Sequence, residues 1–328
     1  MRNSDGFLRT LIRCAGACCL ALLLLASPAL QSGASAALSC SLSGPTLTFG
    51  TINIFSTSTT SGNATFTCTT SGQAQTFYAC LSIGTGTGGT TASNRTLASG
   101  GNTIPIQITG GASWPPQIGN GSSYPMEGVV NFTVPHQSSG SYTFPLVVTI
   151  PAPLSLPPSG TYSSTFTGTD FQVYWNTTSQ STCPALVSAG GTSISSGTFS
   201  VSAVVVNQCS VSATNINFGS ASLLTSALSA SAQVSVTCNS SIPLTVALDN
   251  GATGTGPTNR LMTAGANKIQ YGIYKDSAHS QPWGNTMGVN TASATGPSAT
   301  LTGFGQVPTQ SAPVPGSYAD VVGVTVTY

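Results

Sequence analysis

Short runs in which apolar and polar residues alternate recur along most of the chain, separated by clusters of Gly, Ser, Asn and Pro. Examples are residues 64–68, 233–238, 243–248 and 321–328. Alternation with a period of two places successive side chains on opposite faces of a strand. The spacing of three to four residues that is typical of helices is nearly absent. Many short strands joined by turns predict an all-β fold, either a sandwich or a barrel.

The first 36 residues differ from this pattern. Three arginines precede an apolar run over residues 18–26, and small residues follow up to Ala34-Ser35-Ala36. This order predicts a secretory signal peptide that is cleaved after Ala36. No later run reaches the roughly 18 to 20 apolar residues of a spanning helix, so we expect an exported, soluble product. Acylation of Cys40 is the alternative, but Cys40 lies well beyond the apolar run.

An internal repeat predicts two copies of one domain. The marker residues of the first copy are Cys40, Phe49-Gly50 and Cys68, and those of the second are Cys209, Phe218-Gly219 and Cys238. Further matching segments are 94–97 with 259–262, 106–108 with 269–271, and 148–162 with 305–318. We therefore expect a signal peptide over residues 1–36, an N-terminal domain over 37–206 and a C-terminal domain over 207–328, which are ordinary domain sizes.

Six cysteines follow the predicted cleavage site, and an even number in an exported chain favours three disulfides over metal sites or free thiols. The repeat pairs Cys40 with Cys68 and Cys209 with Cys238, which leaves Cys80 for Cys183. The pairing in the first copy stays open at this stage, because four cysteines allow three connectivities.

Charge is scarce, at 4% of the residues, and the formal net charge is +1. Nucleic acids and anionic membranes are bound chiefly through clustered Lys and Arg, so we expect neither as a partner. The hydrophobic fraction of 40% separates the chain from disordered sequences, which combine low hydrophobicity with high net charge.

The second copy resembles the Spore Coat Protein U domain, the subunit fold of archaic, Csu-type chaperone/usher pili. The residues that carry the resemblance are Cys209, Asn217-Phe218-Gly219, Cys238, Asn259-Arg260, Trp283-Gly284 and segment 315–328. The resemblance implies two immunoglobulin-like β-sandwich domains, of which the second lacks its last strand. Another subunit would fill the groove with an extended strand, which is strand addition to an open sheet. We expect Val322, Val324, Val326 and Tyr328 at this groove.

The two ends of the first copy suggest its place in a pilus. Only Ala37, Leu38 and Ser39 lie between the predicted cleavage site and Cys40, too few to donate a strand. We therefore expect a subunit that accepts a strand at the distal end of the fibre. Residues 198–206 alternate and are predicted to complete the first domain from within the chain. A linker between domains is the alternative, although linkers seldom hold so many β-branched residues.

Two apolar loops of the first copy, residues 110–126 and 151–158, are candidates for the contact surface. The expected contact side chains are Trp114, Pro115, Pro116, Ile118, Tyr124, Met126, Leu154 and Leu156. Prolines restrict a loop backbone and lower the cost of ordering it on binding. The alternative is that these side chains fold back onto the core, above all Trp114 and Ile118. A glycan pocket that stacks sugars on Trp114, Tyr124, Tyr174 and Trp175 is a further possibility.

These observations together predict a non-enzymatic pilus tip adhesin that needs no cofactor or metal. The resemblance implies attachment to abiotic hydrophobic surfaces and biofilm formation, and a host or glycan target is the alternative. A periplasmic chaperone, an outer-membrane usher and an adjacent pilin would be its partners on the way through the periplasm to the cell surface. His136 and Asp170 with a serine are a weak hydrolase candidate, because His136 lacks a nucleophile-elbow context. A non-adhesive pilus or coat subunit also remains open.

Overall fold

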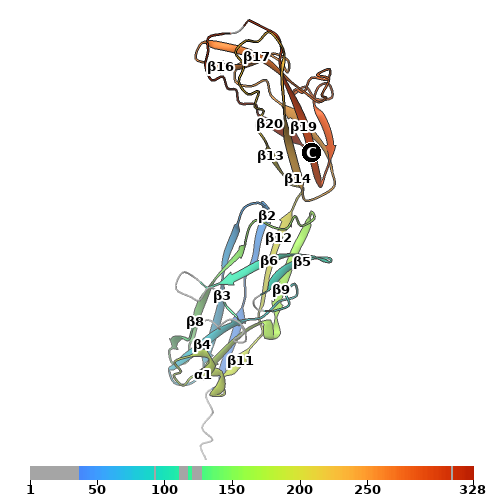
Figure 1. Cartoon of the computed structure of the whole chain (residues 1–328). Coiled ribbons are helices and arrows are strands. Elements are labelled where there is room, and N and C mark those ends of the chain that lie inside the picture. The colour runs from blue at the N-terminus through green and yellow to red at the C-terminus, as the bar shows by residue number, and fades with distance from the viewer. Residues whose placement is uncertain (1–36, 92–93, 111–116, 120–127, 312) are drawn as a thin grey trace, which may run out of the picture.

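The computed structural model describes residues 37–91, 94–110, 117–119, 128–311 and 313–328. Regular structure in this part of the chain is almost entirely strand, with one short helix, α1 (Cys183–Ser188), and one 3-10 turn (Gly168–Asp170). The strands form four sheets that make two successive sandwiches, one blue to yellow and one orange to red in Figure 1. The predicted all-β fold of two sandwiches is confirmed. No described helix has the length and apolar character needed to cross a membrane.

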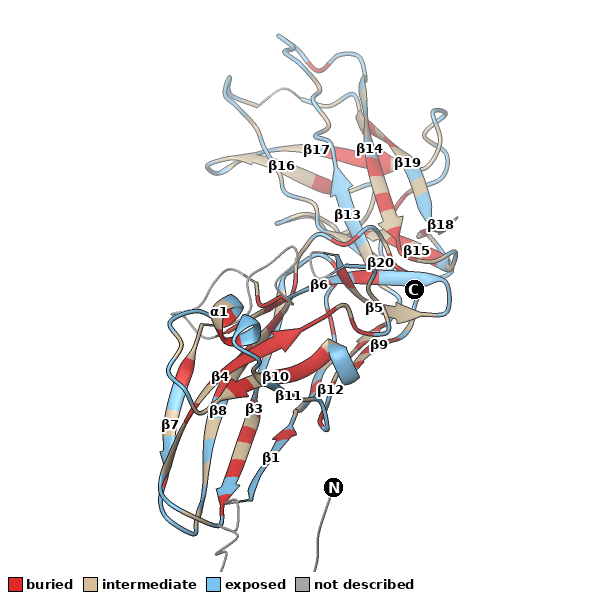
Figure 2. Ribbon diagram, turned by 90° about the horizontal axis from the view of Figure 1, so that it is seen from below, coloured by how far each residue is buried: buried red, intermediate tan, exposed pale blue. Residues whose placement is uncertain are grey.

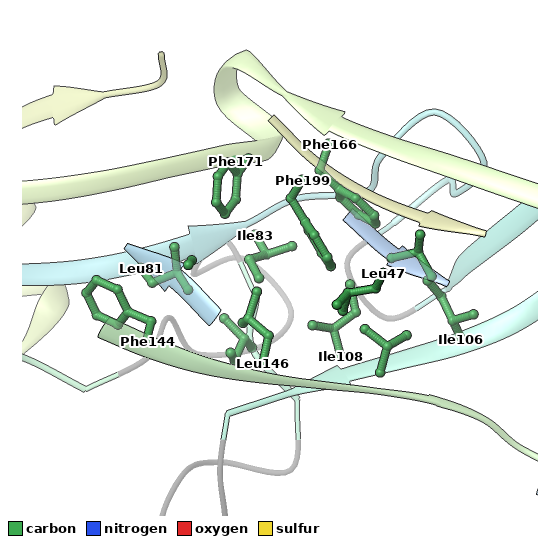
Figure 3. Packing of buried hydrophobic residues seen from close by; sticks show 14 of the residues in the cluster. Leu47, Leu81, Ile83, Ile106, Ile108, Phe144, Leu146, Phe166, Phe171 and Phe199 are labelled. Carbon is green, nitrogen blue, oxygen red and sulfur yellow. The ribbon is translucent and has the colours of Figure 1, made fainter. Parts of the chain in front are cut away.

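Twelve strands of the described residues build the first sandwich. They are β1 (Leu38–Ser43), β2 (Thr46–Thr51), β3 (Ser58–Thr70), β4 (Gln75–Ile83), β5 (Arg95–Ser99), β6 (Asn102–Thr109), β7 (Val130–Val134), β8 (Ser139–Ile150), β9 (Gly160–Thr167), β10 (Phe171–Asn176), β11 (Thr192–Ile194) and β12 (Thr198–Val205). One sheet has the order β1-β3-β8-β6-β5-β9-β12-β2, and the other has the order β11-β10-β4-β7. Inward residues of both sheets, among them Phe144, Phe166, Phe171 and Phe199, fill one core (Figure 3).

The part of the second sandwich that the structure describes has eight strands. They are β13 (Cys209–Ala213), β14 (Leu228–Cys238), β15 (Pro243–Leu248), β16 (Arg260–Ala264), β17 (Asn267–Tyr274), β18 (Ala292–Thr295), β19 (Ser298–Val307) and β20 (Val324–Thr327). The sheets have the orders β13-β14-β19-β17-β16 and β18-β15-β20. Buried residues such as Val236, Val246 and Trp283 form a separate, smaller core.

The alternation in the sequence appears as alternating burial along the strands (Figure 2). In β3, Ala64, Phe66 and Cys68 are buried, while the threonines between them are half-buried. Such alternation is expected for a strand with one face on a core and one toward water. The alternation therefore excludes a register slip of one residue, because such a slip would turn the apolar side chains outward.

All three predicted disulfides are confirmed. Cys40–Cys68 joins β1 to β3, and Cys209–Cys238 joins β13 to β14 at the same place in the second sandwich. Cys80–Cys183 ties helix α1 to β4. Removing a native disulfide from a small secreted domain typically costs about 2 to 5 kcal/mol, so the three bonds stabilise both sandwiches.

The strand register corrects one detail of the sequence repeat. Arg95 pairs with Ile106 in the first sandwich, and Arg260 pairs with Tyr271 in the second. Ile106 therefore corresponds to Tyr271, and the expected match of 106–108 with 269–271 is wrong by two residues. The alternation hides such a shift, because a displacement by two keeps every side chain on its face.

Both sandwiches bury an arginine at the same position. Arg95 donates to the carbonyl oxygens of Ile83 and Gly84, and Arg260 donates to those of Leu248, Asp249, Pro257 and Trp283. The side chain of Arg260 is fully buried. Burial lowers the pKa of Arg260, while Tyr271, Asp249 and Asp320 counteract this change.

Candidate functional site: an open groove in the second sandwich

Strand β12 closes the first sandwich. It pairs antiparallel with β9 along its whole length, from Thr198 opposite Thr167 to Val205 opposite Gly160. It also pairs parallel with β2. Its four inward side chains, Phe199, Val201, Ala203 and Val205, are almost completely buried. The prediction that residues 198–206 supply a strand to the first domain is confirmed, and the linker alternative is wrong.

The second sandwich has no counterpart of β12 among its described strands. The segments that correspond to the two neighbours of β12 are residues 215–220 and 316–323. All these residues are described, and neither segment forms a strand. The one β-type pairing of these two segments is the isolated bridge between Thr263 and Ala319. It lies at the place where Ala98 pairs with Ser163 in the first sandwich. Both segments lack regular pairing because the strand that would lie between them is missing.

A groove with a cavity volume of about 500 Å³ occupies this place. Residues 213–218 form one wall, and residues from Tyr318 to Val324 form the other. The floor is made of inward side chains of the second core, which are Val234, Leu248, Met262, Tyr271, Ile273 and Trp283. The groove therefore opens directly onto the hydrophobic interior, between two backbones that have unused strand edges.

Exposure differs between matching positions of the two sandwiches. Leu42 on β1 is 4% exposed, and Val211 at the same place on β13 is 44% exposed. Trp175 at the end of β10 is 9% exposed, and Tyr328, which follows β20, is 55% exposed. Leu42 lies beside the segment that leads into β12, where its backbone N–H donates to the Ser196 hydroxyl, whereas Trp175 is covered by β11 and by Phe66 and Phe77. The missing segment thus leaves Val211 in water, at a cost of about 25 cal/mol per Å² of apolar surface.

The predicted groove residues are brought together in part. Val322 and Val324 line the groove, half-buried. Val326 packs on the second core without lining the groove, and Tyr328 is exposed. The expected strand over 321–328 is shorter in the structure, where β20 covers only Val324–Thr327.

One carboxylate lies in the groove wall. Asp320 Oδ2 accepts the hydroxyl of Tyr271 at 2.8 Å, and Oδ1 accepts the backbone N–H groups of Ala252 and Val321. Burial raises the pKa of the Tyr271 hydroxyl well above its ordinary value, and the hydrogen bond to Asp320 adds to this rise. These bonds hold Asp320 within its own sandwich. Among the described residues, no group of three His, Cys, Asp or Glu side chains could hold a metal ion.

The first apolar loop is described only in part. Trp114, Pro115, Pro116, Tyr124 and Met126 lie outside the described residues. Ile118 is described and fully buried, so it cannot offer a contact surface.

The position of Ile118 has an equivalent in the second sandwich. Its backbone N–H donates to Ile108, as the N–H of Trp283 donates to Ile273. Ile118 therefore corresponds to Trp283, which is buried as well.

The second apolar loop packs inward. Leu154 is 6% exposed and donates its backbone N–H to Ile54, and Leu156 is half-buried against the same core. The predicted exposure of Leu154 is wrong, and Leu156 is largely covered. The flanking prolines restrict the backbone but do not decide which way the side chains point. The loop lies at the junction with the second sandwich, because the Pro157 carbonyl accepts a bond from Asn239.

Two other candidates have structural roles. The Asp170 carboxylate accepts the backbone N–H groups of Thr85 and Gly86 and so fixes the loop after β4. Trp175, considered for sugar stacking, belongs to the first core, where its ring lies 5.4 Å from that of Phe77.

The fold and the groove define a protein of two immunoglobulin-like sandwiches, the first complete and the second open along one edge of its core. The chain belongs to the Spore Coat Protein U domain family, which matches it over residues 26–169 and 195–325. The recognition made from the second copy is therefore confirmed and extends to the first copy as well.

Several solved structures show a weaker similarity to this chain. A chain of the complex between chaperone and tip adhesion subunit of the archaic chaperone-usher Csu pili of Acinetobacter baumannii is 16% identical, with a TM-score of 0.48 over 88% of this chain and 100% of that one. The CupB6 tip adhesin from Pseudomonas aeruginosa is 13% identical, with a TM-score of 0.30 over 89% and 94% of the two chains.

CfaE, the adhesive subunit of CFA/I fimbria of enterotoxigenic Escherichia coli, is 10% identical, with a TM-score of 0.26 over 86% and 92% of the two chains. No curated protein matches the sequence. Since all three TM-scores lie below 0.5, the classification rests on the family match.

Proposed function

We propose that this protein is an adhesive subunit of a chaperone/usher pilus, and that its second sandwich accepts a strand from another subunit. The observation that carries the proposal is the groove between residues 213–218 and 318–324. It lies where the first sandwich holds β12, so the same chain shows both the filled and the open form of one fold.

A strand in this groove would gain two kinds of interaction. Its backbone would pair with segments 215–220 and 316–323, which now form no ladder. Its alternate side chains would cover the exposed floor of the core, as in other cases of strand addition. Until then the open edge would invite aggregation, so we expect a periplasmic chaperone to cover it and an outer-membrane usher to exchange the chaperone for an adjacent pilin.

The first sandwich is complete without a partner and is the proposed adhesive part. Its own strand β12 fills the place that is open in the second sandwich, so strand exchange is not needed to fold it. The proposed contact residues are Trp114, Tyr124 and Met126, with Pro115 and Pro116 restricting the loop. With 4% charged residues in the chain, a target bound through apolar contacts is favoured over one bound through ion pairs. This adhesin would act at the cell surface, at the pilus tip, in attachment and biofilm formation.

Two neighbouring valines provide a matched test. Val322 lines the groove, whereas Val321 is 80% exposed. We expect Val322→Asp to abolish incorporation of the protein into surface pili, because an unpaired carboxylate would be buried by the incoming strand. Val321→Asp should be incorporated normally. Incorporation is measured by immunolabelling of sheared pili, and equal incorporation of both variants would contradict the proposal.

A further inference from the structure

We propose that the groove selects its donor strand by a fixed register and by the size of the donor side chains, both of which β12 displays. The donor would place an aromatic ring where Phe199 lies and a small side chain where Ala203 lies. Its source would be the strand that leads into the first cysteine strand of another domain of this family. This inference rests on the proposed strand acceptance.

The family boundaries show that the chain already contains one donated strand. The second family match begins at residue 195, so it includes β12 (Thr198–Val205) together with the second sandwich. In space, however, β12 belongs to the first sandwich, where it pairs with β9 and β2. Three residues, 206–208, then lead into β13. The second family unit therefore donates its leading strand to the first unit within one chain.

Two features place the grooves in the same register. Ala98 pairs with Ser163 in the first sandwich, and Thr263 pairs with Ala319 in the second. One residue earlier, Tyr162 and Tyr318 each donate their hydroxyl to the carbonyl four residues before, at Pro158 and Val314. The donor residue that faces Tyr318 is therefore the one that corresponds to Ala203.

The wall at this position requires a small donor residue. Ala203 lies opposite Tyr162, whose ring is buried and fixed by its hydroxyl. Tyr318 is fixed in the same way in the second sandwich. A larger donor side chain would have to displace an anchored ring, and overpacking of this kind destabilises an interior.

The other end of the groove requires a large donor residue. The ring of Phe199 stacks on that of Phe166 at 4.9 Å and lies 5.9 Å from that of Phe171 (Figure 3). By the register of β9 and β10, Val322 and Val324 hold these two places in the second sandwich. Two valines leave more space than two phenylalanine rings, so an aromatic donor residue is needed to fill it.

A synthetic peptide with the sequence of residues 196–206 tests the size rule on the full exported chain. We expect the peptide to raise the melting temperature of the second sandwich in a concentration-dependent way. Peptide variant Ala203→Phe should bind about tenfold more weakly or worse, as overpacking predicts. Variant Val204→Phe adds a ring on the outward face and should bind like the unchanged peptide.

Cross-linking tests the register separately. A peptide with Ser202→Cys should form a disulfide with chain variant Ala319→Cys and not with Ser317→Cys, because directly opposite strand residues are within disulfide distance and diagonal neighbours are not. Equal binding of the Ala203→Phe peptide, or equal cross-linking to both positions, would overturn the register while leaving strand acceptance intact. If the unchanged peptide does not bind, the proposed register and size rule are also overturned. The comparison of Val322→Asp with Val321→Asp then decides whether the second sandwich accepts a strand at all.

Discussion

Gln208 and Asn239 are joined by two hydrogen bonds at the junction of the sandwiches. The backbone N–H of Gln208 donates to Oδ1 of Asn239 at 2.8 Å, and the backbone N–H of Asn239 donates to the carbonyl of Gln208 at 3.1 Å. The first bond uses a side chain of the second sandwich to hold the linker. The short connection between the domains is therefore part of the packed structure.

The two side chains extend this contact into the first sandwich. Gln208 Nε2 donates to the carbonyl of Ile52 at 2.7 Å, and its Oε1 accepts the N–H of Ile54 at 3.0 Å. Asn239 Nδ2 donates to the carbonyl of Pro157 at 3.0 Å, and Asn239 is 6% exposed. A pulling force on the second sandwich would thus reach the first through several bonds besides the chain itself.

Asn239→Ala should loosen this junction. It removes the three side-chain hydrogen bonds of Asn239, from the N–H of Gln208 and to the carbonyls of Pro157 and Val206. Backbone groups at the junction then lose this partner, at a cost of about 1 to 3 kcal/mol for each group left buried and unsatisfied. We expect a wider distribution of distances between spin labels on the two sandwiches and a lower free energy of unfolding. Ser240→Ala, which removes one exposed bond to Asn207, is the control. An unchanged distance distribution in Asn239→Ala would show that the junction is held by other contacts.

Arg260→Met should destabilise the second sandwich. Four backbone carbonyls accept hydrogen bonds from this buried guanidinium and would lose these bonds, so we expect a loss of about 3 kcal/mol or more in chemical denaturation. Lys268→Met removes an exposed cation and should leave stability within about 0.5 kcal/mol of the parent. Equal effects of the two substitutions would mean that the arginine network adds no stability.

Alkaline pH should weaken the second sandwich through Tyr271. Its folded pKa is raised above the ordinary value of 10.0, so the unfolded chain releases this proton first as the pH rises. Stability from this group is complete below pH 10 and is lost progressively above it. Urea unfolding between pH 8 and about 11 should show this decline, and Tyr271→Phe should make it shallower. An equal slope in both proteins would exclude Tyr271 as the cause.

Adhesion should depend on the first apolar loop. We expect the double variant Trp114→Ser and Tyr124→Ser to lose most binding of piliated bacteria to polystyrene, with pili still assembled. The control is Met287→Ser with Val289→Ser, which removes two exposed apolar side chains of the second sandwich. Unchanged binding to polystyrene would move the adhesive surface elsewhere, and a glycan-array signal lost in the first variant would favour a glycan target.

The strands and disulfides were predictable because local signals specify them. Alternation along residues 64–68 defines which side chains face the core, and the repeat places Cys40 and Cys209 at the start of equivalent strands. The burial of Leu154 was not predictable, because it depends on the distant Ile54.

The groove and the junction between the sandwiches could not be predicted from the sequence either. Segments 160–167 and 316–323 are repeats of each other, yet only the first is a strand, because only it has β12 beside it. Gln208 and Asn239 are ordinary polar residues in the sequence, and their role appears only when three distant segments meet. Residues far apart in the chain decide whether segment 316–323 forms a strand and whether Gln208 and Asn239 hold the junction.

Amide hydrogen exchange tests the central claim most directly. We would follow residues 316–323 and 160–167 in the free chain and in assembled pili. The account predicts slow exchange for 160–167 in both samples, and exchange for 316–323 that is fast in the free chain and at least about tenfold slower in pili. Slow exchange of 316–323 in the free chain, or no protection of this segment on assembly, would contradict the proposal that a donated strand completes the second sandwich.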